Sequence, residues 1–345
     1  MKHLELHIIQ SVPVACLNRD DLNSPKTAVF GGVQRARVSS QSWKRAIREM
    51  AKEISPDHFK GERTRLMFEP LVKAMAAVGL SATEAEEGAK KVVDTLVKLD
   101  AKSTDKVKST TLYFMSPLEL ESIAKSYAET KDVKKALKAV DAKSLKDAAD
   151  ISLFGRMVAS DHSLTVEACS MFSHALSTHK VDNEIDFFSA VDDLQSKEES
   201  GAGMTSTLEF NSATYYRFAA LNLDMLADQD HLGSMTKEER QDVVRTFVEA
   251  TIKAIPGARK NTMNGNTLPV YVLGVVREKG HPIQLVNAFE SPVRSSQGYA
   301  AKSVDLLKAE YGKLDGTWGV KAVFDKSIPD IDMNIFLDEV VAYVI

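Results

Sequence analysis

Strand-like sequence lies near both ends of this chain, and a long segment of helical pattern separates the two parts. Residues 3–11 alternate between apolar and polar side chains as a strand does, and strand-like sequence returns from residue 187 onward. Between them, residues 58–180 are rich in lysine and alanine and show helical spacing. The helical pattern is clearest over residues 69–78, 82–99 and 132–140. This order predicts an α+β fold, in which strands from both ends share one sheet and the middle is a helical insertion.

A polar, glycine-containing stretch at residues 196–203 separates two further strand-like runs. The first run covers residues 187–191 and the second covers residues 208–218. Two such strands around a polar tip predict a long β-hairpin. After the hairpin, the pattern predicts a helix over residues 237–255, a strand over residues 270–277 and a helix over residues 303–311.

The composition is that of a globular protein, because 44% of the 345 residues are hydrophobic and 27% are charged. No segment approaches the ~18 consecutive apolar residues of a membrane span, and the amino-terminal residues do not form a secretory signal. The two cysteines, Cys16 and Cys169, form no CxxC pair, which argues against a disulfide framework or a zinc ribbon. We therefore expect a soluble protein of the reducing cytoplasm, without a membrane partner.

Positive charge is concentrated in one window of an acidic chain. The net charge is −4, yet residues 19–48 hold seven basic and two acidic residues, a net charge of +5. The remaining residues therefore carry −9. The seven basic residues are Arg19, Lys26, Arg35, Arg37, Lys44, Arg45 and Arg48. A basic groove on an acidic body suits a protein that binds one polyanion and avoids coating others.

The densest part of this window predicts an amphipathic helix that begins at Ser39 or Ser40, since serine oxygens cap free backbone N–H groups. One face carries Trp43, Ile47, Met50 and Ala51, and the other carries Gln41, Lys44, Arg45 and Arg48. A helix N-terminus with such neighbours favours a bound phosphate. A capped helix with a solvated basic face is the commoner outcome of this pattern, and local sequence leaves both readings open.

Short blocks of distinctive sequence are spread along nearly the whole chain. The amino-terminal blocks are Cys16-Leu17-Asn18-Arg19-Asp20-Asp21, Phe30-Gly31-Gly32 and Arg37-Val38-Ser39-Ser40-Gln41-Ser42-Trp43-Lys44-Arg45. Further blocks are Gly155-Arg156-Met157, residues 175–182, residues 186–194, Tyr216-Arg217-Phe218, Pro256-Gly257-Ala258 and Asn287-Ala288-Phe289-Glu290. In sequence and in order, these blocks resemble the CasC family, the repeated backbone subunit of the type I-E CRISPR Cascade complex, in the RAMP superfamily.

The resemblance implies a modified RRM-like (ferredoxin-like) palm with a helical fingers insertion and a β-hairpin thumb. The implied boundaries are residues 1–57 for the first part of the palm, 58–180 for the fingers, 181–222 for the thumb and 223–345 for the second part of the palm. It also implies a non-catalytic protein without a cofactor, which stacks head to tail with further copies along a crRNA and presents that guide to target DNA. The other expected partners are CasA-like, CasB-like, CasD-like and CasE-like subunits.

The resemblance further implies which residues meet nucleic acid. Guide contacts are expected from Arg19, Lys26, Ser39, Ser40, Gln41, Lys44, Arg45, Arg48, Arg156 and Met157. Thumb contacts with bases are expected from Phe187, Phe188, Val191, Met204 and Leu208, and target-DNA contacts from Lys134, Lys135 and Lys138. Three alternatives stay open: core packing for Met157, packing within the hairpin for the thumb residues, and a solvated face for the lysines. Asp141 departs from the family pattern, which would extend the lysine row.

The adjacent carboxylates Asp20 and Asp21 support a second hypothesis, because two carboxylates beside bound RNA could hold a divalent metal and activate water. The alternative function is therefore a metal-dependent ribonuclease. We expect instead that these carboxylates orient Arg19 or neighbouring donors. The eight histidines show no HxxH, HExxH or DxH spacing, and the sequence has no GxxxxGK[ST] loop or GxGxxG fingerprint, so no metal or nucleotide site is expected.

Overall fold

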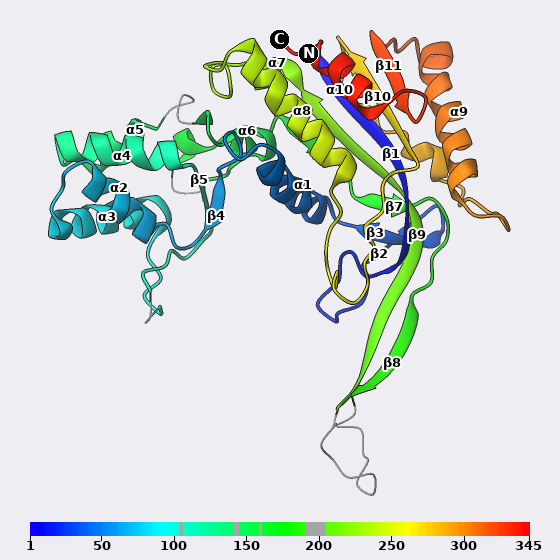
Figure 1. Ribbon diagram of the computed structural model, residues 1–345, viewed down its shortest axis with the longest axis horizontal. Helices are drawn as coiled ribbons and strands as arrows, with labels where there is room; N and C mark the ends of the chain where they lie inside the picture. The colour runs from blue at the N-terminus through cyan, green and yellow to red at the C-terminus, as the bar shows by residue number, and fades with distance from the viewer. Residues whose placement is uncertain (104–105, 141–144, 159–160, 191–203) are drawn as a thin grey trace, which may run out of the picture.

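A large antiparallel sheet forms the centre of the protein in a computed structural model that describes residues 1–103, 106–140, 145–158, 161–190 and 204–345 (Figure 1). The strand order is β11 (Phe324–Ile328), β10 (Tyr271–Arg277), β1 (His3–Ala15), β9 (Met204–Asn222), β7 (Ala175–Ser177), β3 (Val33–Val38) and β2 (Thr27–Phe30). Two further strands, β6 (Ser170–Phe172) and β8 (Glu184–Ala190), pair with β9 beside this path. Strands from both ends of the chain share the sheet, so the predicted α+β class is confirmed.

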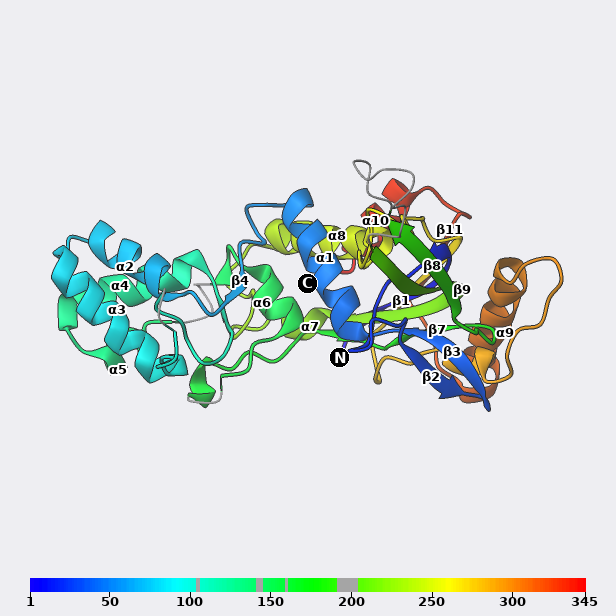
Figure 2. The ribbon, with the colours of Figure 1, turned by 90° about the horizontal axis from the view of Figure 1, so that it is seen from below.

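Helices cover both faces of the main sheet because β1 alternates its side chains between two cores. Leu4, Leu6 and Ile8 pack in one core with α1 (Ser40–Ile54), α8 (Lys237–Lys253) and α10 (Met333–Val341). Ile9 points to the other face and packs in a second core with α9 (Ala300–Trp318). Both ribbon views show α9 on the opposite side of the sheet from α1 (Figures 1 and 2). The helix predicted over residues 237–255 corresponds to α8.

A separate helical core lies to one side of the sheet (Figure 2). Its helices are α2 (Phe68–Ala77), α3 (Ala82–Val97), α4 (Pro117–Thr130) and α5 (Val133–Lys138). Three of them start where serine or aspartate caps them: Ser81 and Ser116 form capping boxes with Glu84 and Glu119 at α3 and α4, and Asp132 caps α5. A small sheet of β4 (Glu62–Thr64) and β5 (Tyr113–Met115) closes this core.

The segment after the helical core returns to the main sheet before residue 180. Helix α6 (Ala149–Phe154) packs in the same core as α1, and β6 and β7 pair with β9. The predicted insertion, residues 58–180, thus also holds strands of the main sheet. The division into palm, fingers and thumb stays a prediction, whereas the structure itself shows a helical part, a main sheet and a long hairpin.

The long hairpin consists of β8 and the first half of β9, and it projects from the main sheet (Figure 1). Pairing runs from Glu184↔Phe210 to Ala190↔Met204. The second half of β9 pairs with β1, from Asn211↔Ala15 to Asn222↔His3. Because one 19-residue strand belongs to both, the hairpin is a continuation of the sheet. The expected tip, residues 196–203, and Val191 lie outside the described residues.

Two details differ from the sequence-based expectations. Helix α9 is longer than predicted, running from Ala300 to Trp318, although Gly312 and Gly316 lower helix propensity. Burial of Leu307 and Leu314 against the sheet outweighs that cost. Short helical turns also occur at α7 (Leu223–Leu226), η2 (His162–Leu164) and η3 (Val286–Phe289). Within the described ranges, no helix combines the length and apolar character needed to cross a membrane.

Candidate nucleic-acid interface

The first turn of α1 is held between two loops that come from distant parts of the chain. Ser39, one of the two predicted caps, is the N-cap, and its Oγ accepts the N–H of Ser42 at 3.3 Å. The N–H of Ser39 donates to Asn18 Oδ1 at 2.9 Å, and the N–H of Ser40 donates to His174 Nδ1 at 3.2 Å. The first turn has no acidic residue. Its partial positive charge is therefore left without a local counterion.

One cation of the basic window belongs to the interior. Arg35 is fully buried, and its guanidinium donates to main-chain oxygens of Phe30, Ser177, Phe289 and Glu290 at 2.9–3.2 Å. These bonds dock the β2–β3 hairpin onto η3. The two-residue loop of that hairpin includes Gly31 at φ +60, where a Cβ would lie only 1.7 Å from the carbonyl oxygen of Glu290. The surface charge of the window is therefore smaller than its composition indicates.

Lys44 and Arg48 lie on the flank of α1 that faces the helical part. The Lys44 Nζ lies 5.5 Å from the centre of the Phe172 ring, and the Arg48 guanidinium carbon lies 5.1 Å from the centre of the Phe114 ring. Arg63 contacts the same Phe114 ring at 5.0 Å. Burial lowers the pKa of Lys44, and the charge of Arg63 lowers it further. Burial also lowers the pKa of Arg48.

The other flank of α1 borders a cleft of about 710 Å³. Arg19 and Arg45 line it, but Arg45 pairs with Glu49 at 2.8 Å and Arg19 Nη1 donates to Asn23 Oδ1 at 3.1 Å. The opposite wall is the segment after α8, which includes Lys260. The predicted guide residues are thus divided between two flanks of one helix. The sequence analysis did not single out Lys260, because only the folded structure places this lysine near α1.

Arg37 and Lys26 extend the cationic set around the first turn of α1, and both lie beside the His174 ring. Burial lowers the pKa of His174, and the charges of Arg37 and Lys26 lower it further, so both cations lie near this ring. The predicted residues Lys26, Ser40 and Gln41 lie in the same region or in the first turn itself. The sequence did not predict His174 at this site, because only the pairing of β7 with β3 brings it next to α1.

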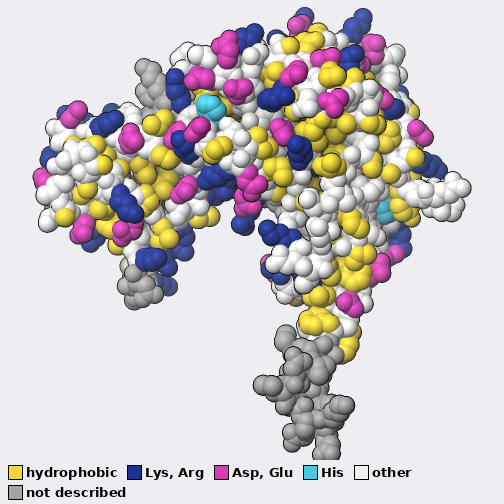
Figure 3. All heavy atoms as spheres, viewed as in Figure 1, with side chains coloured by type: hydrophobic (Ala, Val, Ile, Leu, Met, Phe, Trp, Pro, Cys, Tyr) yellow, Lys and Arg dark blue, Asp and Glu magenta, His cyan; other side chains and the backbone are white. Residues whose placement is uncertain are grey.

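In the space-filling view, Lys and Arg side chains gather around the hollow between the helical part and the main sheet, with Asp and Glu side chains among them (Figure 3). Helix α1 is the element that contributes cations on both of its flanks. This arrangement fits the backbone of an extended polyanion better than a compact substrate, because the cations follow a helix instead of converging on one point.

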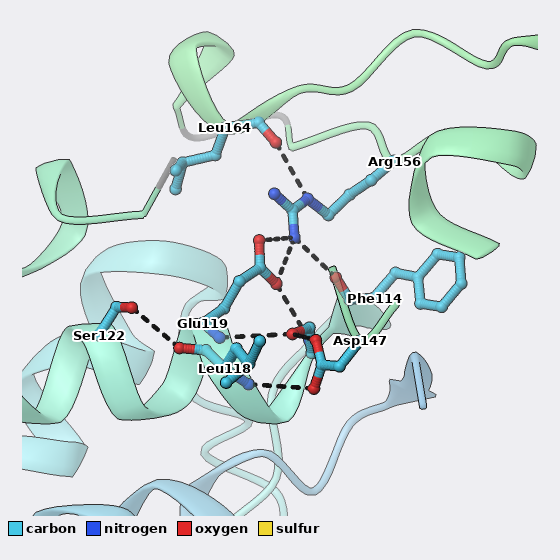
Figure 4. Close-up of polar contacts among 8 residues, drawn as sticks. Phe114, Leu118, Glu119, Ser122, Asp147, Arg156 and Leu164 are labelled. Atoms are coloured by element: carbon cyan, nitrogen blue, oxygen red, sulfur yellow. Dashed lines mark hydrogen bonds and ion pairs between the residues drawn. The ribbon is translucent and has the colours of Figure 1, made fainter. Parts of the chain in front are cut away.

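Arg156 lies inside a buried polar network at the base of α4 (Figure 4). Its Nη1 lies 2.7 and 2.8 Å from the two carboxylate oxygens of Glu119 and donates to Phe114 O at 3.0 Å. Its Nε donates to Leu164 O at 3.0 Å. Burial raises the pKa of Glu119, although Arg156 opposes this shift. In this geometry the charge of Arg156 is balanced within the protein.

Met157 follows Arg156 and has the opposite environment. Its side chain is 82% exposed, so the alternative of ordinary core packing is wrong. The lysines of α5 are also at the surface: Lys134, Lys135 and Lys138 are exposed, while Leu137 between them is buried. Exposure at these positions is compatible with contacts to nucleic acid, which stay a prediction. Asp141, which departs from the family pattern, lies outside the described residues.

The long hairpin exposes apolar side chains on β8. Phe187 is 67% exposed and Ile185, two positions earlier on the same strand face, is 70% exposed, while Phe188 is 36% exposed. Packing within the hairpin therefore does not account for Phe187. Leu208 lies opposite Asp186 and is half-buried, and Met204 pairs with Ala190 through its backbone. Ile185 was missed, although the alternation of Ile185 and Phe187 marks it.

The loop carboxylate Asp20 has a structural role. Its Oδ1 accepts the N–H of Leu22 at 2.9 Å and the N–H of Ser24 at 3.0 Å, which closes a turn. This agrees with the expectation that it orients neighbouring donors. Among the described residues, no group of three or more His, Cys, Asp or Glu side chains could hold a metal ion. The geometry therefore does not favour the ribonuclease hypothesis.

Comparison with known proteins identifies the family. Residues 4–332 match the CT1975-like protein family (Cas_CT1975). The chain belongs to this family. Two solved structures resemble the CT1975-like chain, and both belong to complexes described as CRISPR RNA-guided surveillance complexes, one of them in a pre-nicking state. The pre-nicking chain has a TM-score of 0.85 and 28% identity, with coverage of 99% of this chain and 100% of that one.

The second structure has a TM-score of 0.72 and 26% identity, with coverage of 99% of each chain. No curated protein gives a significant match to the CT1975-like chain. The family match and the two structures confirm the predicted resemblance to CasC-like backbone subunits.

Proposed function

We propose that this protein is a backbone subunit of a CRISPR RNA-guided surveillance complex of the type I-E Cascade kind, which binds crRNA without cutting it. The observation that carries the proposal is the similarity over 99% of the chain, at a TM-score of 0.85, to a chain of such a complex. The cationic flanks of α1 give this similarity a physical basis, because they suit a nucleic-acid backbone.

We first assign guide contacts to cations beside α1 whose charge is free or is supported by an aromatic ring. Lys44 and Arg48 rest on aromatic rings, and Lys26 lies near the first turn. Ser39, Ser40 and Gln41 belong to that turn and add polar groups. Arg19 and Arg45 would engage phosphate after exchanging their present partners. Arg156 is left out of the set, because Glu119 already neutralises it.

Exposed apolar side chains supply the second kind of contact. Met157 and Phe187 are mostly exposed, and each offers a surface against which an unstacked base can pack. We propose that the long hairpin acts as the thumb, and that its apolar face contacts bases or the next copy of the chain. Such a head-to-tail contact is heterologous, so the array grows along the RNA until the guide or end subunits stop it.

The remaining partners follow from the same proposal. The exposed lysines of α5 are proposed to contact target DNA, which pairs with bases that the array leaves free. CasA-like, CasB-like, CasD-like and CasE-like subunits would complete the assembly. We place the protein in the cytoplasm, where the buried thiols of Cys16 and Cys169 stay reduced.

The decisive experiment measures mass against RNA length. Purified protein is mixed with single-stranded RNAs of increasing length, and the mass of each complex is measured by light scattering. The proposal predicts that the mass rises in equal steps, one protein copy for each added interval of RNA. A single bound copy at every length would instead indicate a free-standing RNA chaperone, and the backbone function would be rejected.

A further inference from the structure

Arg217 on β9 is a buried cation with no carboxylate partner among the residues that the structure describes. Its side chain is 5% exposed. One nitrogen, Nη1, donates to Gln10 Oε1 at 2.5 Å, and the other, Nη2, donates to the carbonyl oxygen of Thr251 at 2.5 Å. The guanidinium carbon lies 3.7 Å from the centre of the Trp43 ring. Burial lowers the pKa of Arg217 to about 9.

The charges of other buried arginines of this protein are compensated more fully, although two nitrogens of Arg277 have no hydrogen-bond partner. Arg277 pairs with Glu5 at 2.7 Å, and Arg156 pairs with Glu119 at the same distance. Arg35 has no such pair, but four main-chain oxygens surround its guanidinium. Arg217 has two neutral acceptors and one aromatic face. A buried charge with so little compensation is costly, so its presence calls for a gain outside the folding of the chain.

The position of Arg217 indicates where that gain arises. Trp43 belongs to the first turn of α1, between Ser42 and Lys44. Its indole Nε1 is buried and has no hydrogen-bond partner, so the ring is engaged through its face, on which Arg217 stacks. The guanidinium therefore stacks beneath the turn that forms the proposed guide site together with the neighbouring cations.

All of the charges at this turn have the same sign. The helix N-terminus is partially positive and has no acidic residue in its first turn, and Lys44 follows directly after that turn. Arg217 adds a full positive charge from the interior, where water screens it little. In the free protein these groups repel one another, and a polyanion across the turn would supply the missing negative charge.

We propose that Arg217 is a positioning residue for the polyanion site. It holds Trp43, and with it the first turn of α1, and it adds positive potential from inside the fold without touching the RNA. The proposal rests on the proposed guide-binding function and adds to it a residue that lies in the interior of the fold.

The test compares the affinity for a single-stranded RNA with the stability of each variant. Arg217→Met keeps the volume of the side chain and removes the charge. We expect the folded variant to bind RNA about tenfold more weakly, in keeping with surface potentials of several kT. Because every phosphate contact remains, the slope of log affinity against log salt should stay at the wild-type value. The unfolding temperature without RNA should be equal to that of the wild type or higher, since an uncompensated charge is gone.

A control and a second variant make each outcome informative. The control is Lys308→Met, which removes a lysine that also rests on an aromatic ring, 5.0 Å from the centre of Tyr271. This lysine lies on α9, across the sheet from α1, so the variant should bind RNA as the wild type does. If Arg217→Met does not fold, Arg217→Lys decides, because it keeps the charge and loses the planar contact with Trp43; weaker binding by about threefold is expected.

The proposal would be overturned if a folded Arg217→Met protein bound RNA with wild-type affinity. If the methionine variant does not fold, wild-type affinity of Arg217→Lys would have the same meaning. Loss of affinity that only follows a lower unfolding temperature would also overturn it, since it would show a purely structural role. Failure of the wild-type protein itself to bind RNA would refute the proposed function, which is a separate result.

Discussion

Arg48 of α1 and Phe114 of β5 are in contact, with 5.1 Å between the guanidinium carbon and the centre of the ring. This contact joins the main sheet to the helical part at the edge of the proposed guide site. Arg63 of β4 lies against the same ring, so two cations share one aromatic support. The position of Arg48 therefore depends on the helical part, and the site belongs to both parts of the molecule.

The first prediction concerns the cations on this flank. Replacing Lys44 and Arg48 with alanine should lower RNA affinity and reduce the slope of log affinity against log salt by about 0.7 for each lost phosphate contact. Fluorescence anisotropy at four salt concentrations measures the slope. Lys308→Ala is the matched control, as its lysine has a similar contact with Tyr271 on the far side of the sheet. An unchanged slope in the double variant would show that these side chains do not touch phosphate.

The second prediction concerns Asp150, which lies near Arg48. Burial raises the pKa of Asp150 to about 6, although Arg48 and Lys52 oppose the shift. The folded state therefore holds this proton more tightly than the unfolded chain, where an aspartate has a pKa of about 4. The resulting stabilisation is complete below pH ~4 and is lost as the pH rises through about 6, and it amounts to about 3 kcal/mol.

Asp150→Asn should therefore flatten the dependence of the free energy of unfolding on pH between about 4 and 6. Urea unfolding of both proteins across this range measures the difference. Asp57→Asn, at an exposed aspartate, is the control. A constant difference between Asp150→Asn and the wild type at every pH would contradict the assignment.

The third prediction concerns the buried pair of Arg156 and Glu119. Arg156→Met leaves the Glu119 carboxylate buried without its cation, which should lower the free energy of unfolding by about 3–5 kcal/mol. Adding Glu119→Gln should recover much of that loss. Folded Arg156→Met protein should bind RNA with the wild-type salt slope, because Arg156 makes no phosphate contact in our proposal. A reduced slope would restore Arg156 as a guide-binding residue, as the family resemblance first implied.

The fourth prediction concerns the exposed face of the long hairpin. Phe187→Ser should change the free energy of unfolding by no more than about 0.5 kcal/mol, since the side chain is 67% exposed. It should nevertheless impair the growth of ordered arrays on long RNA, measured by light scattering. Trp318→Ser removes another exposed aromatic, at the end of α9, and should leave assembly intact. Normal arrays with Phe187→Ser would rule out the proposed role of the hairpin face.

The fifth prediction concerns cleavage. Incubation with single-stranded RNA and magnesium or manganese should leave the RNA intact, because Asp20 is engaged in a backbone turn. Denaturing gels detect any fragments. Periodic fragments that disappear with Asp21→Ala would establish the metal-dependent ribonuclease instead.

Elements that depend on neighbouring residues could be predicted from the sequence. The Ser39 cap and the buried face of Trp43 and Ile47 were expected, and α1 shows both. The alternation at residues 3–11 likewise predicted β1. Capping and periodicity are local interactions, so the order of residues is sufficient to reveal them. The approximate position of the candidate site followed from the same segment.

Only the tertiary structure decided which cations can meet a polyanion. Arg35 and Arg48 lie in the same basic window, but Arg35 is enclosed by oxygens from residues 142 and 254 positions away, whereas Arg48 rests on Phe114 at the surface of the hollow. Arg217 is a buried cation because α1 folds over β9. The sequence by itself determined the number of charges and the helix that carries several of them. Their burial and pairing depend on partners that are distant along the chain, and only folding brings those partners together.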